Sequence, residues 1–128
     1  MTTTYPSHPN LDGNYAPLRM ECDLNDLVVE GEVPQDLFGS YYRNGPDPQF
    51  PPKDGHYHWF GGDGMIHAFH FENGKISYKN RWVQTSKYKQ ERRAGKSLTN
   101  LLNPMEPDPL WNPEGENGVA NTNIIFHG

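Results

Sequence analysis

Histidines and aromatic residues gather in one stretch of the sequence, and these are the side chains that could do chemistry. The stretch reads YHWFGGDGMIH from Tyr57 to His67, and His56 precedes it. His56 and His58 are two residues apart, which on a strand would place both rings on one face as a usable pair of metal ligands. Asp63 follows at a distance that suits a third ligand. The alternative is two half-buried histidines that make hydrogen bonds at the end of a sheet, and a two-residue match leaves it open.

The other histidines offer less for metal binding. His67 and His70 are three residues apart, so on a strand their rings face opposite ways and cannot hold one ion together. Packing in the core or across strands is the simpler role for both. His8 lies in a polar segment where we expect it to be solvated, and no role follows for His127.

Four aromatic residues raise a second possibility, which is binding of a flat apolar ligand. Tyr57, Trp59, Phe60 and Trp82 could line an aromatic pocket, or they could belong to an ordinary core. Arg43 opens an RNGP motif that suits either an anion-binding nest or, more simply, a turn that ends a strand. The sequence contains no phosphate-binding GxxxxGK[ST] loop and no CxxC pair.

Composition narrows the class of protein. The 128 residues include 13 glycines and 12 prolines, which favours many short strands joined by turns over a helical fold. The net charge of −5 argues against a nucleic-acid partner, and we interpret the basic residues between 87 and 96 as a solvated helix face. Cys22 is the single cysteine, so no internal disulfide forms, which fits a reducing cytoplasm.

The pattern of apolar and turn residues predicts an all-β fold. Residues 1–17 read as an extended N-terminal arm that gains order only by lying on something else. A short helix over 87–94, capped by Ser86 and ended by Gly95, is the exception to the β pattern. The expected strands, in chain order, are 24–31, 39–43, 56–60, 65–71, 76–85 and 120–126, with Asn73-Gly74 as a hairpin turn and a long loop at 103–118.

Three of these strands, 56–60, 65–71 and 76–85, are expected to form a meander. The last expected strand carries Ile124, Ile125 and Phe126 and has no strand after it. A lone apolar strand of this kind would be an exposed edge. We therefore expect the sheet to continue in polypeptide beyond Gly128.

Several motifs in register resemble the start of the carotenoid cleavage oxygenase family, in particular its bacterial lignostilbene and apocarotenoid dioxygenase types. They are GSYYRNGPDPQF at 39–50, YHWFGGDGMIHAFHFENGKISYKNRWVQT at 57–85 and ANTNIIFH at 120–127. The resemblance implies a seven-bladed β-propeller, of which this chain would be incomplete. Residues 1–17 would be the arm, and 18–128 the first blade region of a domain that continues past the chain.

The resemblance also implies a function. Members of the family hold a non-haem Fe(II) with four histidines and use O₂ to cleave a carbon–carbon double bond in a conjugated substrate. No histidine here matches an iron ligand, so all four are expected downstream of Gly128, and the fragment alone is expected to be inactive. Phe60 resembles the aromatic residue that lies against the substrate. The region of a phenol-binding tyrosine reads Leu101-Leu102, which leaves the choice between a stilbene-like and an apocarotenoid substrate open.

Two alternatives come from other classes of protein. One is a non-catalytic β-domain that binds an apolar or aromatic ligand through Trp59, Phe60 and Trp82. The other is a small cupin-like metalloprotein that uses His56 and His58. The expected partners of the favoured enzyme are O₂ and a small apolar conjugated molecule, with no nucleic acid and with membrane contact left open.

Overall fold

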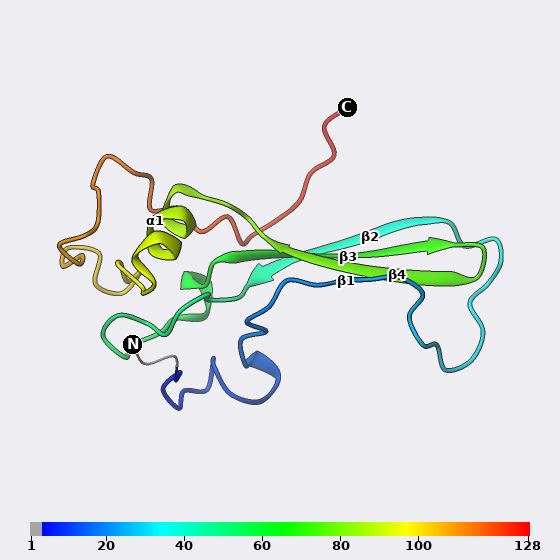
Figure 1. Ribbon diagram of the computed structural model, residues 1–128, viewed down its shortest axis with the longest axis horizontal. Helices are drawn as coiled ribbons and strands as arrows, with labels where there is room; N and C mark the ends of the chain where they lie inside the picture. The colour runs from blue at the N-terminus through cyan, green and yellow to red at the C-terminus, as the bar shows by residue number, and fades with distance from the viewer. Residues whose placement is uncertain (1–3) are drawn as a thin grey trace.

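A long, twisted antiparallel sheet dominates the computed structural model, which describes residues 4–128 (Figure 1). The strand order is β1-β4-β3-β2, and α1 lies at the end of the sheet opposite the β3–β4 turn. The elements are η1 (Gly13–Tyr15), β1 (Asp23–Leu24), β2 (Gly39–Pro46), η2 (Trp59–Gly61), β3 (Gly64–Glu72), β4 (Lys75–Trp82) and α1 (Ser86–Ala94), where η denotes a short 3₁₀ helix. None of the helices in the described residues is long and apolar enough to cross a membrane.

The β3–β4 hairpin forms where the sequence predicts it. Asn73 and Gly74 both have positive φ angles, 51° and 73°, as the tight turn between two twisted strands requires. Alternation along the strands then directs Met65 and Trp82 to one face, where both are buried and form the core with Tyr88 of α1. The core therefore sits at the α1 end of the sheet.

The predicted strand over 56–60 is wrong. Residues 56–58 form no regular structure and Trp59 and Phe60 begin the 3₁₀ turn η2, because the side chain of His58 accepts a hydrogen bond from the N–H of Phe60 and competes with strand pairing. The meander consists of β2, β3 and β4, with β2 paired to β3 along its whole length. Pro46 ends β2 at the edge of the sheet, where its missing N–H is tolerated.

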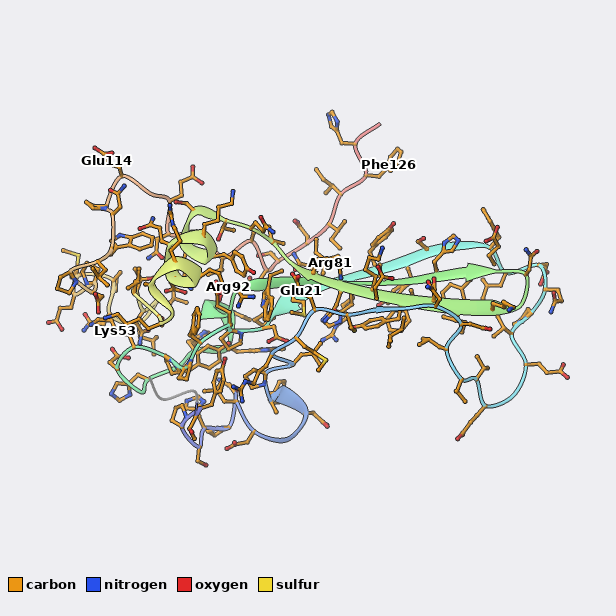
Figure 2. All side chains as sticks on the ribbon, in the orientation of Figure 1. Glu21, Lys53, Arg81, Arg92, Glu114 and Phe126 are labelled. Atoms are coloured by element: carbon orange, nitrogen blue, oxygen red, sulfur yellow. The ribbon has the colours of Figure 1, made fainter. Side chains whose placement is uncertain are left out.

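Two other predicted strands are shortened or absent. Of the first one, predicted over 24–31, only Leu24 lies in a strand, since β1 is Asp23–Leu24, and Asp26 then turns the chain with a φ of 58°. Residues 120–126 form no strand: Ala120 has a φ of 52°, outside the extended range of a strand, and the carbonyls of Ala120 and Asn123 are held by the side chain of Asn44. Phe126 is 97% exposed and projects away from the sheet (Figure 2).

The predicted helix is confirmed as α1. Its N-cap is Thr85, not Ser86: the Thr85 hydroxyl accepts a hydrogen bond of 3.1 Å from the N–H of Tyr88. Gly95 ends the helix in the left-handed conformation with a φ of 69°. The predicted loop over 103–118 contains neither helix nor strand.

The N-terminal arm packs against the loop that follows β2, as the lower part of Figure 1 shows. The hydroxyl of Tyr5 donates to the carbonyl of Pro48 at 2.6 Å, and Leu11 is buried. The arm is not extended throughout, since η1 interrupts it. Residues 1–3 of the predicted arm lie outside the described residues, and the boundary at residue 17 remains a prediction.

Candidate functional site

The aromatic turn, which we define as residues 57–62, presents an aromatic side chain to the surface. The ring of Phe60 is 63% exposed and stacks on Trp59 with a centroid distance of 5.9 Å and an interplanar angle of 27°. His58 meets Phe60 edge-on at 5.1 Å, and Tyr15 of the arm meets Trp59 in the same way at 5.2 Å. Phe60 is thus supported on two sides but does not belong to the core.

Hydrogen bonds fix the backbone of the aromatic turn. Within it, Nδ1 of His58 accepts from the N–H of Phe60 at 3.2 Å, and the carbonyl of His58 accepts from the N–H of Gly61 at 2.8 Å. From outside it, Nδ2 of Asn121 donates to the carbonyls of Phe60 at 2.8 Å and Gly62 at 2.7 Å. The backbone that carries Phe60 is therefore held from both sides.

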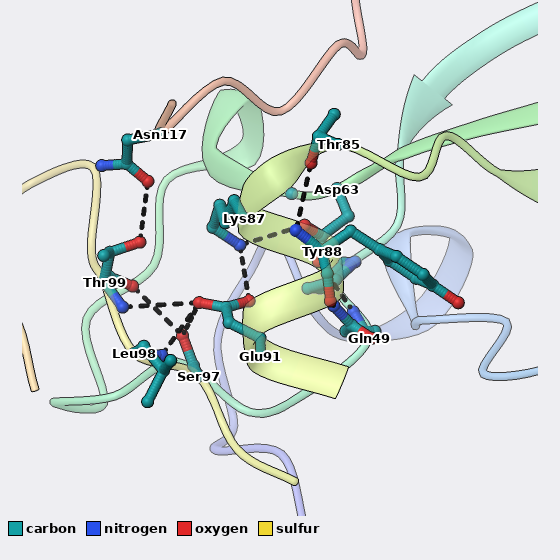
Figure 3. A network of polar contacts seen from close by, with 12 residues as sticks. Gln49, Asp63, Thr85, Lys87, Tyr88, Glu91, Ser97, Leu98, Thr99 and Asn117 are labelled. Carbon is teal, nitrogen blue, oxygen red and sulfur yellow. Dashed lines mark hydrogen bonds and ion pairs between the residues drawn. The ribbon is translucent and has the colours of Figure 1, made fainter. Parts of the chain in front are cut away.

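A buried ion network includes Asp63, the residue that directly follows the aromatic turn (Figure 3). The ammonium of Lys87 on α1 lies 3.0 Å from Oδ1 of Asp63 and 2.7 Å from Oε2 of Glu91. Burial alone would lower the pKa of Lys87, but the two carboxylates outweigh burial and raise it, so Lys87 stays charged. The expectation of a solvated helix face is therefore wrong for Lys87.

Glu91 extends this network to the chain that follows α1. Its Oε1 accepts hydrogen bonds from the N–H of Leu98 at 2.9 Å, from Ser97 Oγ at 3.2 Å and from the N–H of Thr99 at 3.4 Å. Because both carboxylate oxygens have partners, a residue that is only 1% exposed is tolerated as an ion. The network links α1 to residue 63, which directly precedes β3, and to residues 97–99.

Asp47 is a second buried carboxylate, and it anchors the N-terminal arm. Its Oδ1 and Oδ2 lie 3.2 and 3.1 Å from the N–H of Leu18, and its carbonyl accepts from Nε1 of Trp82 at 2.8 Å. Burial raises the pKa of Asp47 to about 6, with a further contribution from the nearby charge of Asp63; the hydrogen bonds from the arm act in the opposite direction.

This raised pKa predicts a pH dependence of stability. Since the folded state holds the Asp47 proton more tightly than the unfolded chain, its contribution to stability is complete below about pH 4 and is lost as the pH rises through about 6. Asp47→Asn, which does not titrate, is expected to remove this part of the dependence. Urea unfolding of the whole protein across this pH range, with and without the substitution, measures it. A stability difference between the two proteins that is independent of pH would contradict the prediction.

The structure separates the residues that the sequence grouped as metal ligands. His56 and His58 do not share a strand face, because the stretch is not a strand and Nδ1 of His58 is already an acceptor for Phe60. Among residues 4–128, no group of three or more His, Cys, Asp or Glu side chains could hold a metal ion. The described residues therefore do not fit the iron that the family resemblance implies.

His67 and His70 have structural partners on opposite faces of β3, as predicted. Nδ1 of His67 is 2.6 Å from the Tyr78 hydroxyl, and Nδ1 of His70 is 2.9 Å from Oγ of Ser40. Burial lowers the pKa of His67, and the charge of Arg43 adds to this effect. Arg43 itself lies within β2, directly opposite His67, and not in a turn.

The structure also separates the four aromatic residues that the sequence grouped as a possible pocket. Trp82 is buried in the core with Met65, and Tyr57 is the buried aromatic residue of the aromatic turn, whereas Trp59 and Phe60 lie at the surface. A cavity of about 160 Å³ lies beside the turn and is lined by residues that include His56, His58 and Leu101. Sequence reasoning missed Asn121 and the ion network; only the four-residue spacing of Lys87 and Glu91 was a local signal for the latter.

Comparison with known proteins identifies the family. Residues 15–128 match the model of the RPE65 family, described as retinal pigment epithelial membrane protein, and the chain belongs to this family. The carotenoid cleavage oxygenase resemblance of the sequence is confirmed. The chain is 44% identical over 125 residues to lignostilbene-α,β-dioxygenase isozyme III of Sphingomonas paucimobilis, and the match covers 96% of this chain and 25% of that protein. It is 45% identical over 119 residues to isoeugenol monooxygenase of Pseudomonas nitroreducens, and the match covers 93% of this chain and 25% of that protein.

A solved structure agrees with the sequence relatives. The crystal structure of lignostilbene dioxygenase from Pseudomonas brassicacearum matches 98% of this chain and 26% of its own, at 40% identity and a TM-score of 0.91. The chain thus spans about a quarter of the length of the relatives it matches. Its antiparallel sheet is the corresponding part of a β-propeller enzyme, which confirms the predicted fold class.

Proposed function

We propose that the whole protein containing this chain is a non-haem Fe(II)-dependent dioxygenase that uses O₂ to cleave a carbon–carbon double bond in a conjugated, stilbene-like or apocarotenoid substrate. The observation that carries the proposal is the match of nearly the whole chain to a lignostilbene dioxygenase in both sequence and structure. On this proposal residues 1–128 supply no catalytic group. The four histidine ligands lie beyond Gly128.

Phe60 is the residue of this chain that we assign to substrate binding. Its exposed, supported ring offers a flat apolar face, and a conjugated substrate would stack on such a face. Leu101 lies next to Gly61 of the aromatic turn, and both Leu101 and Leu102 are more than half exposed. Leucine side chains cannot hydrogen-bond a phenol, so recognition at this end depends on shape and apolar contact.

The proposal is tested on the whole protein loaded with Fe(II). It is supplied with O₂ and, in separate reactions, with lignostilbene, isoeugenol and an apocarotenal, and the aldehyde products are identified by mass spectrometry. Consumption of O₂ with aldehydes from one class of substrate is the expected result. A protein that binds no iron and yields no aldehyde from any of the three would overturn the proposal.

Phe60→Ala is expected to lower kcat/KM of the whole protein by roughly tenfold, mainly through a higher KM, because the substrate loses one stacking face. Steady-state kinetics with the preferred substrate measure the effect. Tyr42→Ala is the matched control: Tyr42 is an aromatic residue of β2 with similar exposure, on the sheet and outside the aromatic turn. Equal kinetics for the two variants would remove Phe60 from the site.

We also propose a cytoplasmic location and no nucleic-acid partner for the whole protein. A single cysteine in 128 residues fits a reducing compartment. The net charge of −5 disfavours a polyanionic ligand.

A further inference from the structure

Ala120 has a strained backbone conformation, and it directly precedes Asn121, which contacts the aromatic turn. Ala120 has a φ of 52°, in the left-handed region that residues other than glycine rarely adopt. Such a conformation persists only where surrounding contacts over-determine it, and these conformations cluster at functional sites. The contacts around Ala120 therefore indicate which part of the structure depends on its left-handed conformation.

Hydrogen bonds on both sides hold Ala120 in this conformation. The carbonyl of Val119 accepts from the N–H of Gly64 at 2.7 Å, at the start of β3. The carbonyl of Ala120 accepts from Nδ2 of Asn44 on β2 at 2.9 Å, and the same nitrogen lies 3.3 Å from the carbonyl of Asn123. These contacts fix residues 119–123 on the edge of the sheet.

The residue after Ala120 is thereby aimed at the aromatic turn. Nδ2 of Asn121 donates to the carbonyls of Phe60 at 2.8 Å and Gly62 at 2.7 Å, which lie on either side of Gly61. A side-chain amide has two N–H donors, so both bonds can form at once. No other side chain from outside the aromatic turn donates to these two carbonyls among the described residues.

We propose that Asn121 is a positioning residue for Phe60, set in place by the left-handed conformation of Ala120. It holds the backbone on both sides of Gly61 and so fixes the direction in which the Phe60 ring faces. Asn121 itself does not touch the substrate. The consequence for catalysis rests on the proposed function, whereas the effect on the turn does not.

Hydrogen exchange of the whole protein tests the effect on the turn without any substrate. Asn121→Asp keeps the size of the side chain but removes both donors, and exchange of peptide 57–64 is expected to rise about tenfold. Exchange of the α1 peptide is the internal reference and should not change. The matched control is Asn123→Asp, the same change in an exposed asparagine whose side chain makes no hydrogen bond in the described chain.

The kinetic arm uses a double-mutant cycle with Phe60→Ala. Asn121→Asp is expected to lower kcat/KM about tenfold in the wild-type background and to have little further effect once Phe60 is alanine. If the wild-type protein cleaves no olefin, the proposed function fails, but the exchange result still decides the role of Asn121. Unchanged exchange at 57–64, or an equal rise at α1, would show that Asn121 does not position the turn.

Discussion

Gly64→Ala is expected to lower the free energy of unfolding of the whole protein by about 3 kcal/mol or more. A Cβ at Gly64 would overlap the carbonyl oxygen of Ala120 and lie 2.9 Å from that of Val119. Both are backbone atoms, which cannot rotate away as the end of a side chain could. Because the N–H of Gly64 is bonded to Val119, the clash can be relieved only by moving the whole 119–123 segment.

A second glycine of the same region provides the control. A Cβ at Gly118 would meet nothing within 4 Å, and its φ is not in the left-handed region, so Gly118→Ala is expected to change stability by less than about 0.5 kcal/mol. Urea unfolding followed by circular dichroism compares the two variants with the wild type. Similar midpoints for both variants would mean that the close approach at Gly64 is not needed for folding.

The parts of the fold that the sequence predicts well are those that local chemistry determines. The hairpin turn at Asn73-Gly74 needs two residues that tolerate positive φ, and the end of α1 needs one at Gly95. The alternation along β3 and β4 follows from the two-residue period of a strand. None of these features depends on a residue far away in the sequence.

Prediction fails where a local competitor or a distant partner decides the structure. The aromatic residues at 57–60 have high strand propensity, yet the imidazole of His58 binds the N–H of Phe60 and closes a turn. Lys87 reads as a solvated helix residue, because its partner Asp63 is 24 residues away. In the first case the local sequence predicts the wrong secondary structure, and in the second it predicts the wrong solvent exposure.

Only part of the candidate site could be predicted from the sequence, for the same reason. Phe60 stands out through the family resemblance, and the structure places it exposed and supported. Asn121 does not stand out, because its role depends on the left-handed Ala120, which residue type does not signal. Side chains that touch a ligand leave motifs, whereas those that hold a backbone in place are found only from coordinates.

Lys87→Ala is expected to destabilise the whole protein by about 3–5 kcal/mol near neutral pH, the range for removal of one partner from a buried ion pair. The substitution leaves the carboxylates of Asp63 and Glu91 buried without a cation. Chemical unfolding near neutral pH measures the loss.

Lys89→Ala is the matched control, since Lys89 lies on the same helix but is exposed and its side chain makes no bond within the described residues. Its substitution is expected to change stability by less than about 0.5 kcal/mol. A Lys87→Ala loss that matches this control would mean that water or rearranged side chains compensate the two carboxylates. A loss in the expected range and well above that of the control would show that the ion network fixes α1 against Asp63, the residue that directly follows the aromatic turn.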